Sequence, residues 1–284
     1  MNKMNLQSKI EYSIALLRKC EQMALDMDSE NGFYLAFSGG KDSQALYHIA
    51  KMAGVKFKAH MNLTSVDPPE VILFVKRNYP DVELIKPKMS IYDMALKKHL
   101  IPTRTIRWCC AEYKEMSGAG KVTLIGIRHA ESSRRSKRNE VEIYNHKFSG
   151  NFDQFSEHKE NMVTCVNGKD KILVSPILYW TEREVWQFLN SNNIPHCKLY
   201  DEGYKRIGCI LCPMSSYKQN LKDCQRFPHV KHKWIQTIQK LIDAGYINRN
   251  FTDAEFGFNW WISDKSFEQY YADEVLQQKI EFNV

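Results

Sequence analysis

The sequence of 284 residues lacks any run of about 18 uninterrupted apolar residues, and its start, MNKMNLQSKIEYS, lacks the apolar core of a secretion signal. We therefore expect a soluble protein of the cytoplasm with no membrane partner. Internal repeats and low-complexity segments are also absent from the sequence. Because 43% of its residues are hydrophobic, the chain can bury a sizeable core, and its length suits one α/β domain with a smaller appendage.

Charge and cysteine content give the first indications of function. A formal net charge of +7 favours anionic ligands such as nucleotides or nucleic acid. The eight cysteines are poor candidates for disulfides, because the cytosol keeps thiols reduced and a chain of this length needs no cross-links. Metal binding or thiol chemistry is the better interpretation of these cysteines.

Helical and strand patterns alternate along the first half of the sequence. Residues 5 to 27 carry apolar side chains at helical spacing, and the strand FYLAF follows them. The stretch from Asp42 to Ala53 predicts a helix that Gly54 ends, and VKFKAHMNL then alternates as a strand does. The alternation extends to the strand KVTLIGI, and the pattern beyond Thr181 is helical.

This alternation predicts the α/β class: a parallel twisted sheet with helices on both faces, Rossmann-like, followed by a C-terminal helical region. We expect three consecutive segments: an N-terminal helix over 1–29, the sheet-containing domain over 30–214 and the helical region over 215–284. The polar stretch 139–162 predicts a mobile loop or insertion. The dipeptide Asn167-Gly168 predicts the turn of a hairpin.

A glycine turn joins the first strand to the following helix, and it has the sequence Ser38-Gly39-Gly40-Lys41-Asp42-Ser43. Glycines let the backbone approach a ligand, exposed amides point inward, and the helix N-terminus adds positive dipole, so the turn suits a phosphate group. The Lys41 side chain supplies a full charge, and the two serines supply hydroxyl donors. An ordinary tight turn is the alternative interpretation of two glycines, but here six consecutive residues fit a phosphate site.

The turn SGGKDS after a strand resembles the pyrophosphate loop of the adenine nucleotide alpha hydrolase superfamily, in which ATP is split between its α and β phosphates. Four further stretches resemble the phosphoadenosine phosphosulfate (PAPS) reductase family within it: LTSVDPPE, GIRHAESSRR, PILYWTEREVWQFLNSNNIP and LYDEGYKRIGCILCP. The resemblance runs from about residue 30 to residue 215 and implies that the 30–214 segment is the nucleotide-binding domain. The ligand that it implies is ATP or a sulfated adenine nucleotide, with Mg²⁺ as a further candidate.

The resemblance also implies roles for single residues. Residues 38 to 43 hold phosphates, Thr64 lies near the adenosine, and Arg128 with Arg134 or Arg135 reaches the anionic end of the nucleotide or substrate. Guanidinium groups suit that task because they bind phosphate oxygens bidentately. The implied catalytic residues are Lys41, Asp42 and Arg128. A solvated basic face is the alternative interpretation of the arginines in RRSKR.

Four of the cysteines form two pairs, Cys109-Cys110 and Cys209-x-x-Cys212. Four thiolates can complete either a tetrahedral zinc site or a cubane iron–sulfur cluster. Adjacent cysteines are awkward for one zinc ion, because the backbone must turn sharply between them. The iron–sulfur branch of the resembled family uses this order of pairs, so the resemblance favours a [4Fe-4S] cluster over zinc. The remaining cysteines suit apolar packing.

Reductases of the resembled family carry a nucleophilic cysteine in a short C-terminal Glu-Cys-Gly motif, whereas the last cysteine of this sequence is Cys224. The pattern is therefore more similar to the sulfur-inserting relatives, notably the ATP pyrophosphatase component of DNA phosphorothioation systems. This implies an ATP-dependent sulfurtransferase with a cysteine desulfurase as sulfur donor and a nucleic acid as acceptor. The alternatives are an adenylyl or phosphoadenylyl sulfate reductase with another thiol nucleophile, and a non-catalytic nucleotide-binding module.

Overall fold

The computed structural model describes residues 5–144, 149–150, 170–247, 251 and 253–281. The chain divides into two compact units, each assembled from separate stretches. Unit 1 consists of Met1–Leu63, Pro69–Lys86 and Tyr113–Ile207, and unit 2 consists of Thr64–Pro68, Pro87–Glu112 and Gly208–Val284. The three consecutive segments expected from the sequence differ from this division, because the stretches after the second and third strands leave the sheet and pack with the C-terminal helices.

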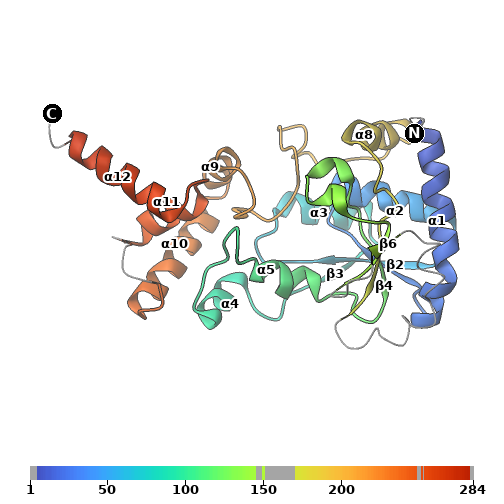
Figure 1. Ribbon diagram of the computed structural model, residues 1–284, viewed down its shortest axis with the longest axis horizontal. Coiled ribbons are helices and arrows are strands. Elements are labelled where there is room, and N and C mark those ends of the chain that lie inside the picture. Colours follow the sequence, from blue (N-terminus) through green and yellow to red (C-terminus); the bar gives the residue numbers. More distant parts are fainter. Residues whose placement is uncertain (1–4, 145–148, 151–169, 248–250, 252, 282–284) are drawn as a thin grey trace. The chain divides into compact units, whose positions relative to one another are not determined.

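Unit 1 is built on a sheet that, in the described part of the chain, has seven strands in the order β3-β2-β1-β4-β7-β5-β6 (Figure 1). The strands are β1 (Phe33–Ala36), β2 (Phe57–Asn62), β3 (Glu83–Ile85), β4 (Val122–Leu124), β5 (Val141–Ile143), β6 (Ser149–Gly150) and β7 (Ile172–Val174). The first five strands in this order pair in parallel, and β5 and β6 add an antiparallel edge. The fold class expected from the sequence is confirmed.

The antiparallel edge corrects one expectation. The stretch 139–162 was expected to be a loop, yet Val141–Ile143 forms strand β5 and pairs with β7. A strand of only three residues is too short to show its period in the sequence. Residues 151–162 of that stretch, like the predicted turn at Asn167 and Gly168, lie outside the described residues.

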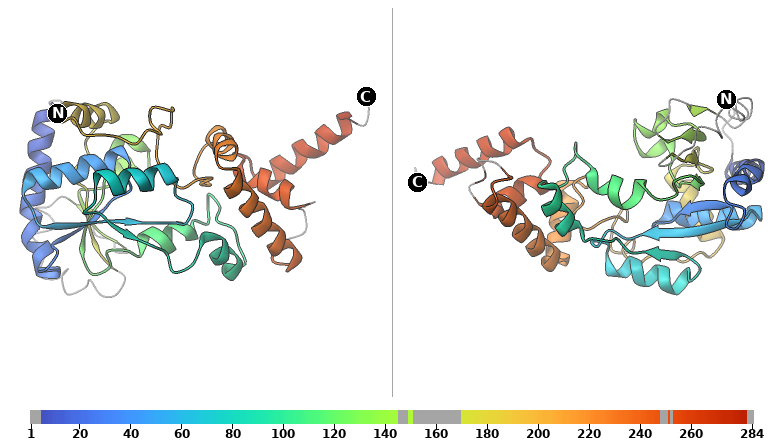
Figure 2. Two further views of the ribbon diagram at one scale, coloured as in Figure 1. Left: turned by 180° about the vertical axis from the view of Figure 1, so that it is seen from behind. Right: turned by 90° about the horizontal axis from the view of Figure 1, so that it is seen from below.

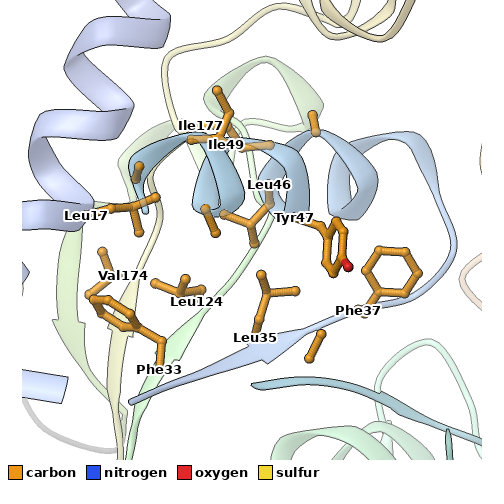
Figure 3. Packing of buried hydrophobic residues seen from close by; sticks show 14 of the residues in the cluster. Leu17, Phe33, Leu35, Phe37, Leu46, Tyr47, Ile49, Leu124, Val174 and Ile177 are labelled. Atoms are coloured by element: carbon orange, nitrogen blue, oxygen red, sulfur yellow. The ribbon is translucent and has the colours of Figure 1, made fainter. Parts of the chain in front are cut away.

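The helices of unit 1 are α1 (Leu6–Met27), α2 (Lys41–Ala53), α3 (Pro69–Asn78) and α8 (Glu182–Ser191). The α2 helix follows β1 directly and ends as predicted at Gly54, whose φ of 71° is a left-handed conformation that glycine adopts readily. Of its apolar side chains, Leu46 points toward Leu35 of β1, and Ile49 lies beside Ile177 (Figure 3). All four of these side chains are fully buried, so this packing holds the N-terminus of α2 at a defined place above the sheet.

The opposite face of β1 carries Tyr34, whose ring stacks on that of His60 from β2 with centroids 4.1 Å apart. A turn after residue 115 covers this face. A Cβ added to Gly118, at a φ of 74°, would lie 2.5 Å from Thr123 Oγ1 and 3.1 Å from the Tyr34 ring. The close approach of the backbone therefore requires glycine there.

Unit 2 is mainly helical. Its helices are α4 (Ile91–Lys98), α5 (Trp108–Cys110), α9 (Tyr217–Arg226), α10 (Pro228–Asp243), α11 (Ala254–Ile262) and α12 (Phe267–Glu281), and Figure 2 shows the last four in orange to red. The Trp234 ring on α10 packs against Tyr92 of α4 and Trp261 of α11, with centroid distances of 5.0 and 4.7 Å. Within the described residues, every helix is too short or too polar to cross a lipid bilayer.

Candidate functional site

The turn between β1 and α2 is held in shape by its serines and glycines. The Ser43 hydroxyl accepts a hydrogen bond from the Ser38 N–H (3.2 Å) and donates to the Gly40 carbonyl (2.8 Å). Gly39 has a φ of 72°, and a Cβ there would lie 2.8 Å from Val71 Cγ1. The chain therefore needs glycine at position 39 both for its conformation and for the closeness of α3.

A cavity of about 170 Å³ opens at this turn, at the carboxyl end of β1, where ligands of parallel sheets bind. Its lining includes the turn, the segment after β4 and a segment after α8: Ala36, Ser38, Gly40, Lys41, Asp42, Ser43, Gly126, Ile127, Glu131, Arg135, Tyr200, Arg206 and Ile207. All of these residues belong to unit 1. The cavity is thus formed within one compact unit by stretches that are far apart in the sequence.

Lys41 is the most buried charge of the cavity, with 2% of the residue exposed. Its ammonium lies 3.3 Å from Glu182 Oε1 and donates to the Lys205 carbonyl at 3.1 Å. Its backbone N–H, the first of α2, donates to the Tyr200 hydroxyl at 2.9 Å. A buried ammonium at a helix N-terminus creates a strongly positive potential that favours an anionic ligand.

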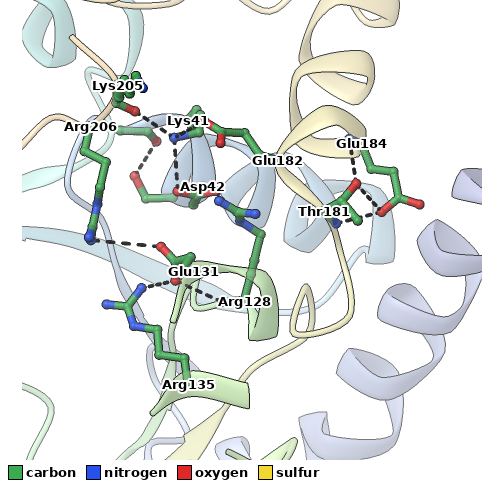
Figure 4. A network of polar contacts seen from close by, with 12 residues as sticks. Lys41, Asp42, Arg128, Glu131, Arg135, Thr181, Glu182, Glu184, Lys205 and Arg206 are labelled. Atoms are coloured by element: carbon green, nitrogen blue, oxygen red, sulfur yellow. Dashed lines mark hydrogen bonds and ion pairs between the residues drawn. The ribbon is translucent and has the colours of Figure 1, made fainter. Parts of the chain in front are cut away.

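Arginines add further positive charge around the same cavity (Figure 4). Arg128 is almost fully buried, and its Nε donates to Asp42 Oδ1 at 2.7 Å. Glu131 accepts a hydrogen bond from Arg135 Nη1 and lies 4.0 Å from Arg206 Nη2. Burial, together with the neighbouring guanidinium of Arg206, lowers the pKa of Arg135. Several cations held close together in this way are stabilised when an anion binds among them.

The structure brings together most of the residues expected for nucleotide binding. Five residues of the 38–43 turn and Arg135 line the cavity. Gly39 and Arg128 lie outside the lining: Gly39 packs closely against α3, and Arg128 donates to Asp42 of the lining. Arg134 is exposed and lies outside the lining, whereas Arg135 is one of the lining residues. Thr64 belongs to unit 2, where its hydroxyl lies 3.4 Å from Cys209 Sγ.

Four cavity or cavity-edge residues were not identified from the sequence: Glu131, Glu182, Tyr200 and Arg206. All four lie inside stretches whose family resemblance had been noticed, GIRHAESSRR, PILYWTEREVWQFLNSNNIP and LYDEGYKRIGCILCP. The signal was therefore present in the sequence. It did not reveal which of the polar residues in those stretches face the ligand.

The four paired cysteines all belong to unit 2, and all are half-buried thiols. The pKa of the Cys109 thiol is raised, mainly by a hydrogen bond with Cys110. Burial and the charges of Cys209 and Cys212 raise this pKa further. Arg107 Nη2 donates to Cys110 Sγ at 3.2 Å. The four sulfurs are therefore near enough to interact electrostatically.

These cysteines can be tested against the cluster that the sequence suggests. Four thiols in one compact unit, with a guanidinium donor beside one of them, have the donor chemistry that an iron–sulfur cluster needs. Within the described residues, no three or more His, Cys, Asp or Glu side chains are arranged as ligands of one metal ion. In a [4Fe-4S] cluster each thiolate binds a different iron, so the donor set fits such a cluster without converging on one ion.

The fold and the cavity define an α/β protein with a cavity at the carboxyl end of its first strand that is lined in part by cations. The profile of the phosphoadenosine phosphosulfate reductase domain matches residues 32–215, which is more than half of the chain. The chain belongs to this family.

Several proteins are similar to the chain in sequence. An uncharacterized protein of Methanocaldococcus jannaschii is 25% identical over 265 residues, which are 88% of this chain and 58% of the relative. The adenosine 5'-phosphosulfate reductase of Lysinibacillus sphaericus is 26% identical over 159 residues, 52% of this chain and 58% of that enzyme. The chain thus spans little more than half the length of these relatives.

Solved structures show weaker similarity. The phosphoadenylyl-sulfate reductase of Candida auris has a TM-score of 0.43 and 16% identity, covering 73% of this chain and 96% of that one. The U34-tRNA thiolase NcsA of Methanococcus maripaludis, solved with its [4Fe-4S] cluster, has a TM-score of 0.40 and 10% identity, covering 84% and 82% of the two chains.

Proposed function

We propose that this chain is an ATP-dependent sulfurtransferase of the ATP pyrophosphatase type, which transfers AMP from ATP to an acceptor oxygen and so prepares that oxygen for replacement by sulfur. The observation that carries the proposal is the buried Lys41 ammonium at the first residue of α2, directly after the Ser38-Gly39-Gly40 turn. A helix N-terminus, two glycines and a buried ammonium together favour a ligand with a chain of phosphates.

In the first step of the proposed reaction, the acceptor oxygen attacks the α-phosphorus of ATP and pyrophosphate leaves. The Lys41 ammonium stabilises the charge on the departing pyrophosphate, and Arg135 supplies a further cation from the cavity wall. Arg128 keeps the Asp42 carboxylate in place, and that carboxylate is the candidate ligand of a Mg²⁺ ion accompanying ATP. In the second step a sulfur nucleophile displaces AMP from the activated acceptor.

We propose a nucleic acid, foremost DNA, as the acceptor and a cysteine desulfurase as the source of sulfur. The support is the charge of the helices α9 and α10, where residues 217–243 contain six Lys or Arg and two Asp. Lys218 and Lys233 are exposed, and the side chain of Tyr217 is also accessible. Cations interleaved with an aromatic side chain suit the phosphates and bases of a nucleic acid.

The thiol group of unit 2 is the proposed place of a [4Fe-4S] cluster, held by Cys109, Cys110, Cys209 and Cys212. When bound, such a cluster supplies either a sulfur-carrying iron or a rigid link between the two cysteine pairs. The chain's own residues contribute the Arg107 donor to Cys110 and the Thr64 hydroxyl beside Cys209, and both tune the sulfurs that they touch.

The test of the proposed activity is the identity of the products formed from ATP. Purified protein with Mg²⁺, a DNA acceptor and sulfide as the sulfur nucleophile should release pyrophosphate and AMP, and a Lys41→Met variant should release pyrophosphate about a hundredfold more slowly. Lys51→Met is the matched control, because Lys51 lies on the same helix with 55% of its side chain exposed. Release of ADP and phosphate, or full activity of Lys41→Met, contradicts the proposal.

The second candidate function is reduction of adenylyl sulfate or its 3′-phosphate. The sequence similarity to the adenosine 5'-phosphosulfate reductase of Lysinibacillus sphaericus favours it. Incubation of the protein with each sulfated nucleotide and reduced thioredoxin separates the two functions. Sulfite release supports the reductase, whereas a thiolated nucleotide in digested DNA, detected by mass spectrometry, supports the sulfurtransferase.

A further inference from the structure

The Tyr200 side chain lies against the first turn of α2. Its hydroxyl accepts the hydrogen bond of the Lys41 backbone N–H at 2.9 Å, and a Cβ added to Gly40 would lie 3.4 Å from the same hydroxyl. The Tyr200 ring packs edge-on against Trp186, with centroids 4.9 Å apart at 88°. The phenol group is therefore held in place, and its oxygen takes a position where a phosphate oxygen could accept from the helix N-terminus.

The Tyr200 hydroxyl can also donate a hydrogen bond through its proton. A phenol oxygen both accepts and donates, and here it accepts from Lys41. In the part of the chain that the structure describes, the Tyr200 proton has no hydrogen-bond acceptor. Tyr200 is one of the residues that line the cavity. Burial raises the pKa of Tyr200, so the group remains a neutral donor at physiological pH. The Tyr200 O–H is therefore available to donate a hydrogen bond to an oxygen atom of a ligand in the cavity.

Arg206 comes from the same segment as Tyr200 and lines the same cavity. Its side chain is 70% exposed, and its Nη2 lies at a loose 4.0 Å from Glu131 Oε1. The other oxygen of this carboxylate, Oε2, accepts from Arg135. Two guanidinium groups therefore share one carboxylate, which leaves positive charge for a ligand.

We propose that Tyr200 and Arg206 are ligand-binding, specificity-determining residues for a diphosphate group. The Tyr200 O–H donates to a non-bridging oxygen of that diphosphate, and the Arg206 guanidinium turns from Glu131 to the same group. The ligand class is a nucleoside triphosphate or free pyrophosphate, which carries more charge than the phosphosulfate of a sulfated nucleotide. This inference rests on the proposed function, since it requires nucleotide phosphates to bind at the Lys41 turn.

The experiment measures the affinity of the full chain for pyrophosphate, ATP and AMP by isothermal titration calorimetry. Tyr200→Phe keeps the ring and removes the hydroxyl, and we expect it to bind pyrophosphate and ATP about tenfold more weakly with AMP affinity unchanged. Arg206→Gln should weaken pyrophosphate binding by about tenfold and make the remaining affinity less dependent on salt. Tyr144→Phe is the matched control, because the Tyr144 hydroxyl donates to Glu115 at 2.8 Å and lies outside the cavity lining.

The possible outcomes separate this inference from the function on which it rests. If the unaltered chain binds neither ATP nor pyrophosphate, the proposed function and this inference fall together. If it binds both and Tyr200→Phe binds them equally well, only this inference is wrong. Equal weakening of AMP and pyrophosphate binding also overturns it, because the hydroxyl then acts on the site as a whole. Arg206 is exposed, so its variant keeps the test decisive even if Tyr200→Phe does not fold.

Discussion

Arg128 Nε donates to Asp42 Oδ1 at 2.7 Å and so joins the segment after β4 to the first turn of α2. The side chains of Arg128 and Asp42 are 4% and 19% exposed, so water screens their charges only weakly. A Cβ added to Gly126 would lie 3.0 Å from the Asp42 carbonyl, which shows how closely the two segments approach. The ion pair therefore holds together the two sides of the phosphate site.

Removal of Arg128 should destabilise the protein through the carboxylate left behind. We expect Arg128→Met to lower the free energy of unfolding by about 3 kcal/mol, because Asp42 then keeps only the longer contact of its Oδ2 with Lys41 Nζ, at 3.8 Å. Urea unfolding followed by circular dichroism measures the change. The double variant Arg128→Met with Asp42→Asn should recover a large part of the lost free energy of unfolding. Strictly additive losses from the two single variants would show that the ion pair contributes no interaction free energy.

Gly39 should tolerate a methyl group much less well than Gly54. The two glycines have φ values of 72° and 71°, so alanine meets the same backbone strain at both positions. Only at Gly39 does the added Cβ meet neighbours, Val71 Cγ1 at 2.8 Å and Val75 Cγ2 at 2.9 Å. Gly54→Ala should cost about 1 kcal/mol of unfolding free energy and Gly39→Ala about 1–3 kcal/mol more. Equal losses in urea unfolding would be evidence against the close packing of α3.

The Asp28 carboxylate should make the free energy of unfolding of unit 1 depend on pH in the acid range. Its hydrogen bond from Lys121 Nζ at 2.5 Å is the main cause that lowers its pKa from 3.8 to about 2. Since the folded pKa is the lower one, the stabilisation is complete above pH 4 and is lost as the pH falls from about 4 to 2. Lys121 is 36% exposed, so we expect a contribution of only about 1 kcal/mol.

The variants Asp28→Asn and Lys121→Met should each flatten the fall in unfolding free energy between pH 4 and pH 2. Both together should flatten it no further, because they remove the same interaction. Urea titrations at several pH values measure the slope. An unchanged slope in both single variants would assign the acid sensitivity to other groups.

A cluster in unit 2 should be visible as colour. Protein purified without oxygen should be brown and contain about four iron atoms per chain if the four thiols hold a [4Fe-4S] cluster. Cys209→Ser should lose the visible absorbance and the iron. Cys224→Ser is the control, because Cys224 belongs to the same unit and burial raises the pKa of its thiol. A colourless protein with one stoichiometric zinc ion would identify a zinc site.

The basic helices of unit 2 should bind DNA in a salt-dependent way. Neutralising Lys218 and Lys233 together, as Lys218→Gln with Lys233→Gln, should reduce the slope of log affinity against log salt by about 1.8. Fluorescence anisotropy with a short DNA duplex at several salt concentrations measures this slope. The pair Lys19→Gln with Lys76→Gln changes the net charge equally in unit 1, so an equal effect would indicate general charge attraction and no specific surface.

The turn that lines the cavity was predictable to the extent that it is local. Six consecutive residues, from Ser38 to Ser43, contain the strand end, both glycines, the cation and the helix start. Such a turn is determined by the conformational preferences of its own residues, and the sheet places its neighbours. The same reasoning predicted the end of α2 at Gly54 and the parallel order of alternating strands and helices.

The walls of the site were not predictable, because they come from elsewhere in the chain. Tyr200 and Lys41 are 159 residues apart in sequence, and only the packing of the segment after α8 brings them within 2.9 Å. Thr64 likewise has a neighbour that the sequence does not indicate, because its hydroxyl lies 3.4 Å from Cys209 Sγ, 145 residues further along the chain.

The sequence by itself determined the fold class, the glycine turn between β1 and α2 and the two cysteine pairs, because each depends on the identity and order of neighbouring residues. Only the tertiary structure decided that Arg135 rather than Arg134 faces the cavity, that Glu131 is shared by two arginines and that all four paired cysteines belong to one unit. These features depend on contacts between distant segments, and such contacts are set by how the helices pack on the sheet and on one another.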